Sequence, residues 1–474
     1  MPRSGIRGLA GFCLLAGCGS NPGLPPSLVP GSAAGYNLVL LTLDTTRADR
    51  LGAYGWEPAS TPALDRLAEE GLKFTGAISP APMTLPAHAS ILTGLDPPSH
   101  GVHHNGQFSL DESFTTIAER LESQGYDTAA FVSAFVLDGR YGLRQGFAVY
   151  DDQVEPAPGQ AFGGLDSQRS ARDVTERALA WLGTRTRQGP FFLWVHYYDP
   201  HAAYEPPEPF ASQFAGAPYD GEIAYMDSEI DRILTSVRAR AEPALIVAAG
   251  DHGESLGEHR EPTHSRLIYD ATQRVPMIWW SPGLIGGPLV MEDTVGLIDV
   301  FPTLLDVLGV EFDASSLDGR SLVRHHEEED RALYMETMAT YLDNGWSPLH
   351  GLRTQRAKYI LAPRPEYYDL ESDPGEKNNR YDIARSHADE ALERLETLLK
   401  QKLGGMATAA SIAEGARPVD PDALRRLQAL GYLGGGGSAD PSLAPDSLPD
   451  PKDMLPGSGS PCGSRRSTLG REVR

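Results

Sequence analysis

The chain has 474 residues, long enough for one large α/β domain and a smaller partner. Its net charge of −23 argues against nucleic acid as a ligand, because a phosphate-binding surface needs a basic face. An anionic substrate would therefore have to be attracted by a metal ion and by a few local groups.

The first residues predict a targeting segment, not part of the fold. Arg3 and Arg7 form a short basic region, and the apolar stretch from Gly8 to Gly17 is too short to span a bilayer. Leu15-Ala-Gly-Cys18 resembles a bacterial lipobox. The resemblance implies a signal peptide over residues 1–17, lipidation of Cys18, and an exported protein anchored at the cell envelope, on its periplasmic or outer face. Residues 18–35, rich in Pro, Ser and Gly, then predict a flexible tether.

Three short apolar runs each end in acidic or histidine residues. Residues 37–43 lead into Asp44, residues 191–198 into Asp199 and His201, and residues 244–249 into Gly250-Asp251-His252. Apolar runs without alternation are typical of parallel strands that are buried on both faces. Ligands of open α/β sheets bind beyond the carboxyl ends of the strands, so the three ends predict one metal-bearing active site. His196, inside the second run, is expected to be a core histidine.

A fourth segment contains a candidate nucleophile. Pro86 suits the first turn of a helix that Gly94 would end, which places Thr84 just ahead of the helix N-terminus. Backbone N–H groups and the helix dipole attract an oxyanion there. A hydroxyl beside oxygen ligands and a metal ion can attack a phosphoryl or sulfuryl centre. A plain N-cap role for Thr84 is compatible with this, since both roles need the hydroxyl at the same helix end.

Several motifs together resemble the sulfatase family of the alkaline phosphatase superfamily, over roughly residues 36 to 403. The matching stretches are Leu43-Asp-Thr-Thr-Arg-Ala-Asp-Arg-Leu-Gly-Ala-Tyr-Gly55, Thr84-Leu-Pro-Ala-His88, Leu92-Thr-Gly94, Asp199-Pro-His201, Gly250-Asp-His-Gly-Glu-Ser-Leu-Gly-Glu-His259, Arg274-Val-Pro-Met-Ile278 and Tyr368-Asp-Leu-Glu-Ser-Asp-Pro-Gly-Glu376. The resemblance implies an ester hydrolase with a large mixed or parallel sheet flanked by helices. It also implies a smaller α+β subdomain after the catalytic domain.

The chain departs from the family at the nucleophile. Typical members carry Cys or Ser, which is oxidised to formylglycine, and an Arg four residues later. This chain has Thr84 and His88 at these positions, and both are included in the predicted catalytic set. Threonine carries a methyl group on Cβ and cannot yield formylglycine, so Thr84 would act as a plain alkoxide. This favours phosphate or phosphonate esters, without excluding sulfate esters.

The family pattern implies a metal site formed by Asp44, Thr84, Asp251 and His252. Where calcium-type members commonly show Asp-Asn and a doublet of aspartates, this chain has Asp251-His252 and Leu43-Asp44. One imidazole nitrogen among oxygen ligands favours Mn²⁺ or Zn²⁺, with Ca²⁺ as the alternative.

Other residues are implied to bind the substrate. His201 matches the family's substrate-binding histidine, and His264 lies near the position of a lysine and could protonate the leaving group. As an alternative, Asp199, His201 and His264 could hold a second metal ion. Asn105 and Arg47 are further candidates for contact with the anionic ester.

The domains follow from the same patterns. Residues 36–310 alternate strand and helix patterns and form the predicted catalytic domain. Residues 311–403 form the predicted subdomain, which ends in an amphipathic helix over residues 387–403. Residues 404–474 predict one more helix and a disordered tail.

The sequence thus predicts an exported, lipid-anchored, metal-dependent hydrolase of sulfate or phosphate/phosphonate esters, acting on a glycan or a lipid head group. Two alternatives stay open. The first is an envelope phosphotransferase of the same superfamily, which passes the group to a lipid or glycan. The second is an inactive protein that keeps the fold to bind an anionic glycan.

Overall fold

The computed structural model describes residues 24–154, 168–186, 188–324, 330–419, 421–429 and 443–456. The predicted signal peptide and Cys18 lie outside this range, as does the start of the tether. Among the described helices, none combines the length and the apolar composition needed to cross a membrane.

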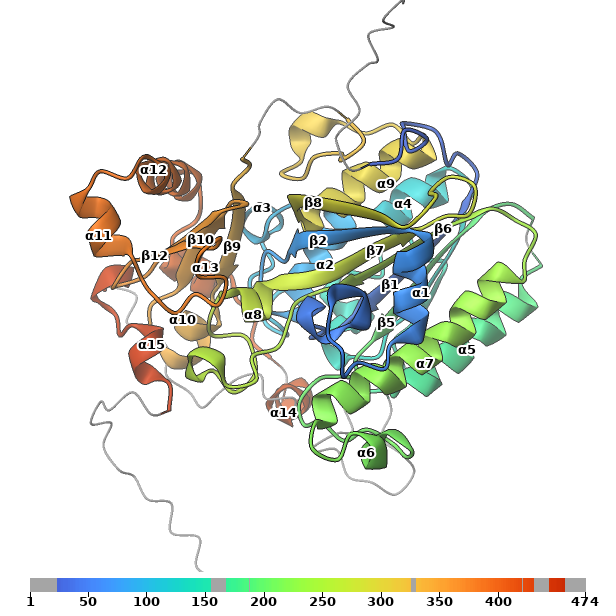
Figure 1. The fold of residues 1–474 in the computed structure, drawn as a ribbon, viewed down its shortest axis with the longest axis horizontal. Helices are drawn as coiled ribbons and strands as arrows, with labels where there is room; N and C mark the ends of the chain where they lie inside the picture. The colour runs from blue at the N-terminus through green and yellow to red at the C-terminus, as the bar shows by residue number, and fades with distance from the viewer. Residues whose placement is uncertain are drawn as a thin grey trace, which may run out of the picture.

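The predicted catalytic domain is built on an eight-stranded mixed sheet with the order β4-β3-β5-β1-β6-β7-β2-β8 (Figure 1). Its strands are β1 Asn37–Leu43, β2 Leu72–Ile78, β3 Asp127–Phe131, β4 Val149–Asp151, β5 Phe191–Tyr197, β6 Ala244–Gly250, β7 Arg274–Trp280 and β8 Leu289–Gly296. β1 pairs in parallel with β5 on one side and β6 on the other, and β7 runs antiparallel to β6 and β2. The predicted fold class and the three predicted central strands are confirmed.

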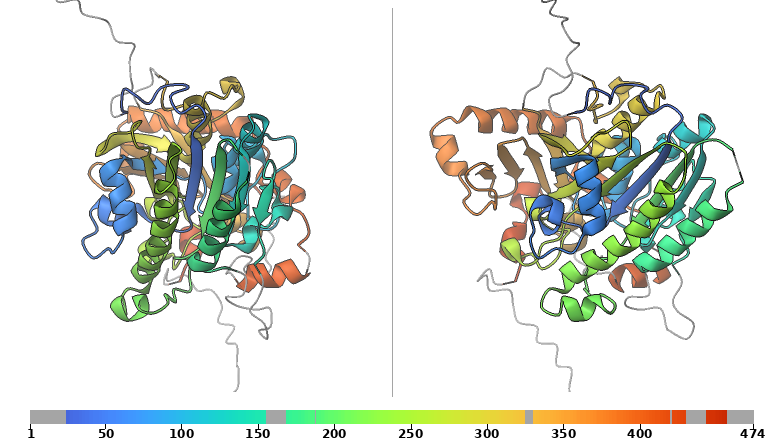
Figure 2. Two further views of the ribbon diagram at one scale, coloured as in Figure 1. Left: turned by 90° about the vertical axis from the view of Figure 1, so that its right-hand side faces the viewer. Right: turned by 45° about the vertical axis from the view of Figure 1, so that its right-hand side comes forward.

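Helices cover both faces of this sheet (Figures 1 and 2). One face carries α1 Pro62–Glu70, α5 Ala171–Thr184 and α7 Pro218–Arg238, and the other carries α2 Thr84–Thr93, α4 Ile117–Ser123 and α9 Val300–Leu308. Residues of β1 alternate between the two layers: Leu38 and Leu40 join the core under α2 and α9, whereas Val39 and Leu41 join the core under α5 and α7. This two-sided burial is why β1 is apolar at nearly every position.

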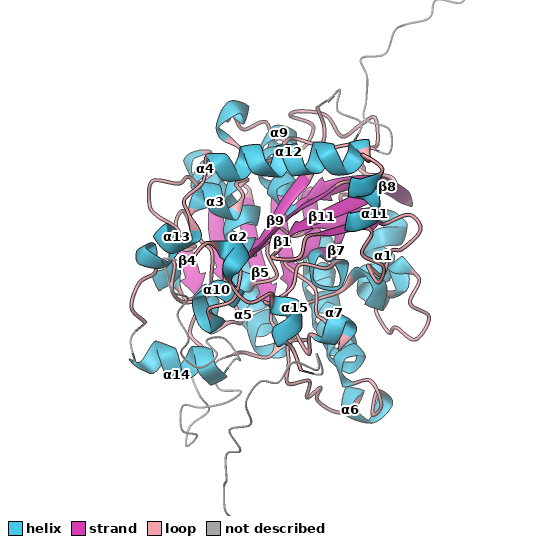
Figure 3. Ribbon diagram, turned by 90° about the vertical axis from the view of Figure 1, so that its left-hand side faces the viewer, coloured by secondary structure: helices cyan, strands magenta, loops and turns pink. Residues whose placement is uncertain are grey.

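The predicted C-terminal subdomain is a four-stranded antiparallel sheet with helices (Figure 3). Its elements are β9 Leu333–Thr337, α10 Ala339–Asn344, β10 Leu349–Arg353, β11 Ala357–Leu361, β12 Glu366–Asp369, α11 Tyr381–Ser386 and α12 Glu390–Gly404. Leu392, Leu395 and Leu399 of α12 are buried against this sheet, as the predicted amphipathic spacing requires. The shorter helices α3 Pro97–His100, α6 Phe210–Gln213, α8 Asp270–Gln273, α13 Ala409–Gly415 and α14 Pro421–Ala429 complete the two parts.

A buried ionic cluster joins the two parts of the chain. The ammonium group of Lys358, on β11, is fully buried and lies 2.6 Å from Asp270 of α8 and 2.6 Å from Glu376. Arg353 of β10 pairs with Asp270 at 3.0 Å. Because a buried charge is costly unless it is paired, this cluster fixes β10 and β11 to α8, which precedes β7.

Part of the tail differs from the predicted disorder. Asp450 accepts a hydrogen bond from the Lys452 N–H and caps α15 Pro451–Met454, where Pro451 occupies the first helical position. The ammonium group of Lys452 lies 2.7 Å from Glu366, and Leu455 is buried in the subdomain core. A capped turn with one apolar anchor and one ion pair therefore packs on the subdomain, which the polar composition of the segment did not indicate.

Candidate active site

The order of the central strands brings two acidic residues together. Asp44 directly follows β1, and Asp251 directly follows β6, the parallel neighbour of β1. The backbone N–H of Thr45 donates to Asp251 Oδ1 at 3.2 Å, and Thr45 takes a left-handed conformation with φ 50°. The chain thus turns sharply after β1, and the turn itself binds the second carboxylate.

Thr84 lies at the start of α2, beside these carboxylates. The helix begins at Thr84 with Met83 as N-cap, one residue earlier than predicted, and ends at Gly94 with φ 73°. Thr84 Oγ1 donates to Asp44 Oδ2 at 3.3 Å and lies 3.5 Å from His252 Nε2. The nucleophile predicted from the sequence is therefore in contact with two of the predicted metal ligands.

The ligand atoms of Asp44, Asp251 and His252 all lie within 4.8 Å of one another. His252 Nδ1–H donates to the Gly253 carbonyl at 2.9 Å, so Nε2 carries the lone pair and lies 3.6 Å from Asp44 Oδ1. Asp44 Oδ1 and Asp251 Oδ2 are buried and have no hydrogen-bond partner within the described part of the chain. Two orphaned carboxylate oxygens and one imidazole nitrogen fit a divalent cation.

The electrostatics of these groups agree with this fit. Burial raises the pKa of Asp44, and the nearby charge of Glu254 raises it further. Burial likewise raises the pKa of Asp251, and Asp44 adds to the effect. Burial lowers the pKa of His252, which keeps the ring neutral and able to act as a ligand. A bound cation would lower the pKa of both carboxyl groups, because its positive charge stabilises two ionised carboxylates at close range.

A second cluster of possible ligands consists of His88, His196 and Asp251. Its hydrogen bonds argue against a metal site. His88 Nδ1 lies 2.7 Å from the Thr84 carbonyl, which can only accept, so Nδ1 carries the proton and donates it there. Burial lowers the pKa of His88 and keeps the ring neutral, so Nε2 accepts from the Thr42 hydroxyl at 2.9 Å, while Thr42 Oγ1 accepts the Trp194 Nε1–H at 2.9 Å. His88 therefore supports the first turn of α2 and is not available as a ligand.

His201 and His264 are buried beside His252. The His264 ring is 4.7 Å from the ring of His252 and 4.9 Å from that of His201, between ring centres. His264 Nδ1 lies 3.0 Å from Glu254 Oε1, and His201 Nδ1 donates to the Ala202 carbonyl at 2.7 Å. Burial lowers the pKa of His264 to about 3, assisted by Arg266, so this imidazole is neutral at pH 7.

Glu254 is a site residue that the sequence reasoning missed. It is fully buried, it binds His264, and its second carboxylate oxygen has no hydrogen-bond partner within the described part of the chain. Burial raises its pKa, and Tyr204 and Arg47 act in the opposite direction. The sequence signal for Glu254 is its position directly after Gly250-Asp251-His252-Gly253, close to the end of a buried strand. A glutamate in the interior is rare unless it is paired, so its burial indicates a role.

Two sequence candidates are not brought into this cluster. The Arg47 guanidinium pairs with Asp49 and Glu258, each at 2.8 Å, and donates to the Glu254 carbonyl at 3.1 Å. Burial raises the pKa of Asp199 to about 7, and the backbone of Ala171 in α5 hydrogen-bonds its carboxyl group. Neither residue belongs to the cluster of Asp44, Asp251 and His252.

Asn105 lies beside Thr84, the predicted nucleophile, on a loop that contacts the subdomain. Asn105 Oδ1 accepts the Leu85 N–H of α2 at 2.9 Å, which identifies Nδ2 as the other amide atom. Nδ2 is buried and has no hydrogen-bond partner among the described residues. The preceding residues bind the subdomain: His103 pairs with Glu336 at 2.6 Å, and His104 pairs with Asp343 at 3.1 Å.

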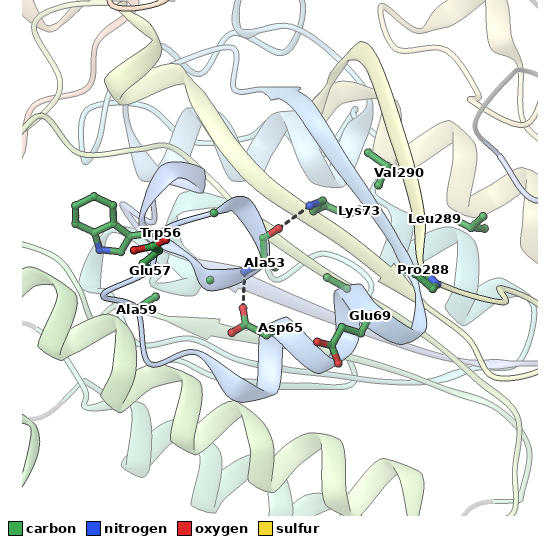
Figure 4. Close-up of a pocket in the computed structure, with 13 residues that line it drawn as sticks. Ala53, Trp56, Glu57, Ala59, Asp65, Glu69, Lys73, Pro288, Leu289 and Val290 are labelled. Atoms are coloured by element: carbon green, nitrogen blue, oxygen red, sulfur yellow. Dashed lines mark hydrogen bonds between the residues drawn. The ribbon is translucent and has the colours of Figure 1, made fainter.

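A separate pocket of about 600 Å³ lies between α1, β2 and β8 and contains none of the predicted site residues (Figure 4). Lys73 Nζ donates to the Ala53 carbonyl at 2.6 Å, and Asp65 Oδ1 accepts the Ala53 N–H at 2.6 Å. These charged groups stabilise the turn before α1, so the pocket does not offer a second catalytic constellation.

Comparison with known families assigns most of the chain. Residues 36–310 match the family described as Sulfatase, and residues 257–406 match the family described as N-sulphoglucosamine sulphohydrolase, C-terminal. An arylsulfatase of Clostridium perfringens is 25% identical over 460 residues, covering 78% of this chain and 94% of the relative. A multifunctional alkaline phosphatase superfamily protein of Trinickia caryophylli is 26% identical over 470 residues, covering 72% and 90%.

Solved structures share the fold. The phosphonate monoester hydrolase of Agrobacterium radiobacter superposes with a TM-score of 0.64 at 23% identity, covering 77% of this chain and 96% of the other. The protein BT4656, solved in complex with its substrate D-glucosamine-2-N,6-O-disulfate, superposes with a TM-score of 0.66 at 20% identity, covering 82% of this chain and 99% of the other.

Proposed function

The chain belongs to the sulfatase family, and from this premise we propose that it hydrolyses sulfate or phosphate/phosphonate esters with Thr84 as the nucleophile. The observation that carries the proposal is the position of Thr84 Oγ1, 3.3 Å from Asp44 Oδ2 and 3.5 Å from His252 Nε2. This hydroxyl is buried and faces both a carboxylate and an imidazole at the carboxyl ends of β1 and β6, as a catalytic hydroxyl would. Its fit with the predicted metal ligands supports a hydrolytic centre.

Asp44, Asp251, His252 and Thr84 are the residues that would hold the cation. When bound, the cation would lower the pKa of the Thr84 hydroxyl and balance negative charge on the ester oxygens. The nitrogen ligand His252 favours Mn²⁺ or Zn²⁺ over Ca²⁺. Threonine excludes a formylglycine at this position, so we propose an alkoxide mechanism.

In the first step, Asp44 Oδ2, which lies 3.3 Å from Thr84 Oγ1, accepts the Thr84 proton. The new bond joins Thr84 Oγ1 to the phosphorus or sulfur, while the bond to the leaving oxygen breaks, and that oxygen departs as an anion that solvent protonates. In the second step, water attacks the phosphorus or sulfur, the bond to Thr84 Oγ1 breaks, and the proton held by Asp44 returns to the threonine oxygen. His264, whose Nδ1 lies 3.0 Å from Glu254 Oε1, is positioned to accept the proton of this water. We therefore assign His264 the role of a base, in place of the general acid expected from the sequence.

We propose that Asn105 and His201 bind the non-bridging oxygens of the ester. The buried Asn105 Nδ2 is a donor beside the start of α2, and Oδ1 is already held by Leu85. The Leu85 N–H is consequently engaged, so the helix N-terminus offers an oxyanion fewer donors than the sequence suggested. His201 is packed face to face on Tyr198 and presents its ring toward His264.

The test compares Thr84→Ala and Thr84→Ser with the wild type on nitrophenyl sulfate, a nitrophenyl phosphate monoester and a diester, each with Mn²⁺, Zn²⁺ or Ca²⁺. We expect phosphoester turnover that Thr84→Ala abolishes and Thr84→Ser retains in part. Thr93→Ala is the matched control, because Thr93 lies in the same helix and donates only to the Ala89 carbonyl. Turnover unchanged in Thr84→Ala would refute the nucleophile, and metal binding without turnover of any ester would favour a glycan-binding protein.

We further propose that the substrate ester is carried by a glycan or a lipid head group and that Cys18 anchors the protein at the cell envelope. A solved structure with this fold binds a disulfated glucosamine, which supports a glycan. Incorporation of a labelled fatty acid into the wild type, but not into Cys18→Ser, would test the anchor.

A further inference from the structure

His196 lies in the middle of β5 and is fully buried. Its place in an apolar strand predicts a core histidine, and no ester-hydrolysing step above uses it. β5 is the neighbour of β1 in the sheet, and His196 pairs in register with Thr42, two residues before Asp44. Its side chain contacts the predicted metal ligand Asp44, with Nε2 3.2 Å from Oδ2.

The hydrogen bonds of His196 fix the position of its ring proton. The backbone N–H of Ser133 donates to Nδ1 at 3.2 Å, and a backbone N–H can only donate. The Ser133 hydroxyl also donates to the His196 carbonyl at 2.7 Å, which ties this loop to β5. Because Nδ1 accepts, Nε2 carries the proton, and Nε2 lies 3.2 Å from Asp44 Oδ2.

This contact distinguishes the two oxygens of Asp44. Oδ2 accepts from His196 Nε2–H and from the Thr84 hydroxyl, whereas Oδ1 has no hydrogen-bond partner in the described ranges. Oδ1 is also the oxygen that lies 3.6 Å from His252 Nε2. His196 thus holds the carboxylate in the rotation that turns Oδ1 toward the predicted cation.

We infer that His196 is a positioning residue, which orients Asp44 for the cation through a proton that Ser133 fixes on Nε2. The inference rests on the proposed metal-binding role of Asp44. A histidine that holds a ligand in this way affects the affinity for the metal directly, and it affects turnover only through that ligand.

Two substitutions in the full chain isolate the contact. In His196→Asn the side-chain oxygen can still accept the Ser133 N–H but cannot reach Asp44, whereas the longer amide of His196→Gln can place its nitrogen near the position of Nε2. We expect His196→Asn to weaken Mn²⁺ binding, measured by titration calorimetry, by about 10–100-fold, and His196→Gln to weaken it by less than about tenfold. His100→Asn is the matched control, because His100 is a buried histidine that also accepts a backbone N–H, from Val102, and it bonds Ser90 instead of a metal ligand. We expect it to keep the wild-type affinity.

Equal Mn²⁺ affinities of His196→Asn and His196→Gln would overturn the inference while leaving the proposed function intact. A wild type that binds none of Mn²⁺, Zn²⁺ and Ca²⁺ would instead overturn the proposed function and the inference with it. A second measurement needs no substitution: nitrogen NMR of histidine-labelled wild type should show the His196 ring with its proton on Nε2. A proton on Nδ1 would refute the inference even if the Asn variant fails to fold.

Discussion

Replacing Asp251 with asparagine should have opposite effects on the metal-free and the metal-bound protein. Without a cation, Asp251 and Asp44 are buried carboxylates whose ligand oxygens lie within 4.8 Å of each other. Burial and this mutual repulsion raise the pKa of Asp251. Asp251→Asn removes one of the two charges, so the metal-free variant should be more stable than the metal-free wild type. The same change removes a ligand, so stabilisation by metal should be lost.

The magnitude follows from the geometry. Two unit charges 4.8 Å apart repel each other by about 3.5 kcal/mol at an effective dielectric constant of 20. Sharing of one proton between the carboxylates reduces this value, so we expect a gain of about 1–3 kcal/mol in the metal-free state at pH 7. In the wild type, a metal concentration one hundred times the Kd should add about 2.7 kcal/mol, which the variant lacks.

The assay is thermal unfolding of the wild type and Asp251→Asn, with chelator and with Mn²⁺, between pH 5 and pH 8. A carboxylate whose pKa is raised by folding stabilises the protein below its unfolded pKa, and this contribution is lost as the pH rises. The advantage of the metal-free variant should therefore grow from pH 5 to pH 8. The control is Asp227→Asn, since this buried carboxylate accepts two N–H groups of α1, from Ala63 and Leu64, and lies outside the site. That control should lower stability and keep the response to metal.

Two results would refute the reasoning about Asp251. The first is a metal-free Asp251→Asn that melts at a lower temperature than the metal-free wild type at pH 8. The second is a variant that Mn²⁺ still stabilises as much as it stabilises the wild type. Either result would mean that Asp251 is held by protein donors and not by a cation.

Three further predictions concern other residues. Asn105→Asp keeps the acceptor for the Leu85 N–H but loses the Nδ2 donor. We expect kcat/KM to fall by about 10²–10³-fold while the melting curve stays cooperative. An unchanged kcat/KM would contradict the proposed role of Asn105. Glu254→Gln removes the carboxylate that orients His264, so kcat should fall by about tenfold or more with little change in Mn²⁺ affinity, as steady-state kinetics and calorimetry would show. Lys358→Met leaves Asp270 and Glu376 buried without their ammonium partner. The free energy of unfolding, measured with denaturant, should fall by about 3–5 kcal/mol, and a fall of less than about 1 kcal/mol would be inconsistent with a buried ionic cluster.

The sequence could predict the residues that follow buried strands. Asp44 and Asp251 each come directly after an apolar run, and parallel pairing of β1 with β6 brings them to one edge. Thr84 was predicted because Pro86 and Gly94 are helix signals, and only the starting residue of α2 differs by one position. These predictions succeed because strand ends and helix ends are defined by local patterns.

The supporting residues could not be predicted in the same way. Thr42 and His196 lie inside apolar strands, where periodicity indicates only core positions, and their roles depend on neighbours at distant positions in the chain. Arg47 is predicted from the sequence to contact the anionic ester, and in the structure Asp49 and Glu258 bind its guanidinium. The sequence does not determine which partner a long side chain reaches.

The pairing of His103 with Glu336 and of His104 with Asp343 has a consequence for how the protein can be divided. These two contacts connect the loop that carries Asn105 to β9 and α10, so the small sheet acts as a brace for the first turn of α2. An isolated fragment ending near residue 310 would keep Asp44, Thr84 and Asp251 but would lose this brace. The smallest catalytically competent unit of the chain should therefore extend through α10, well past the point where the large sheet is complete.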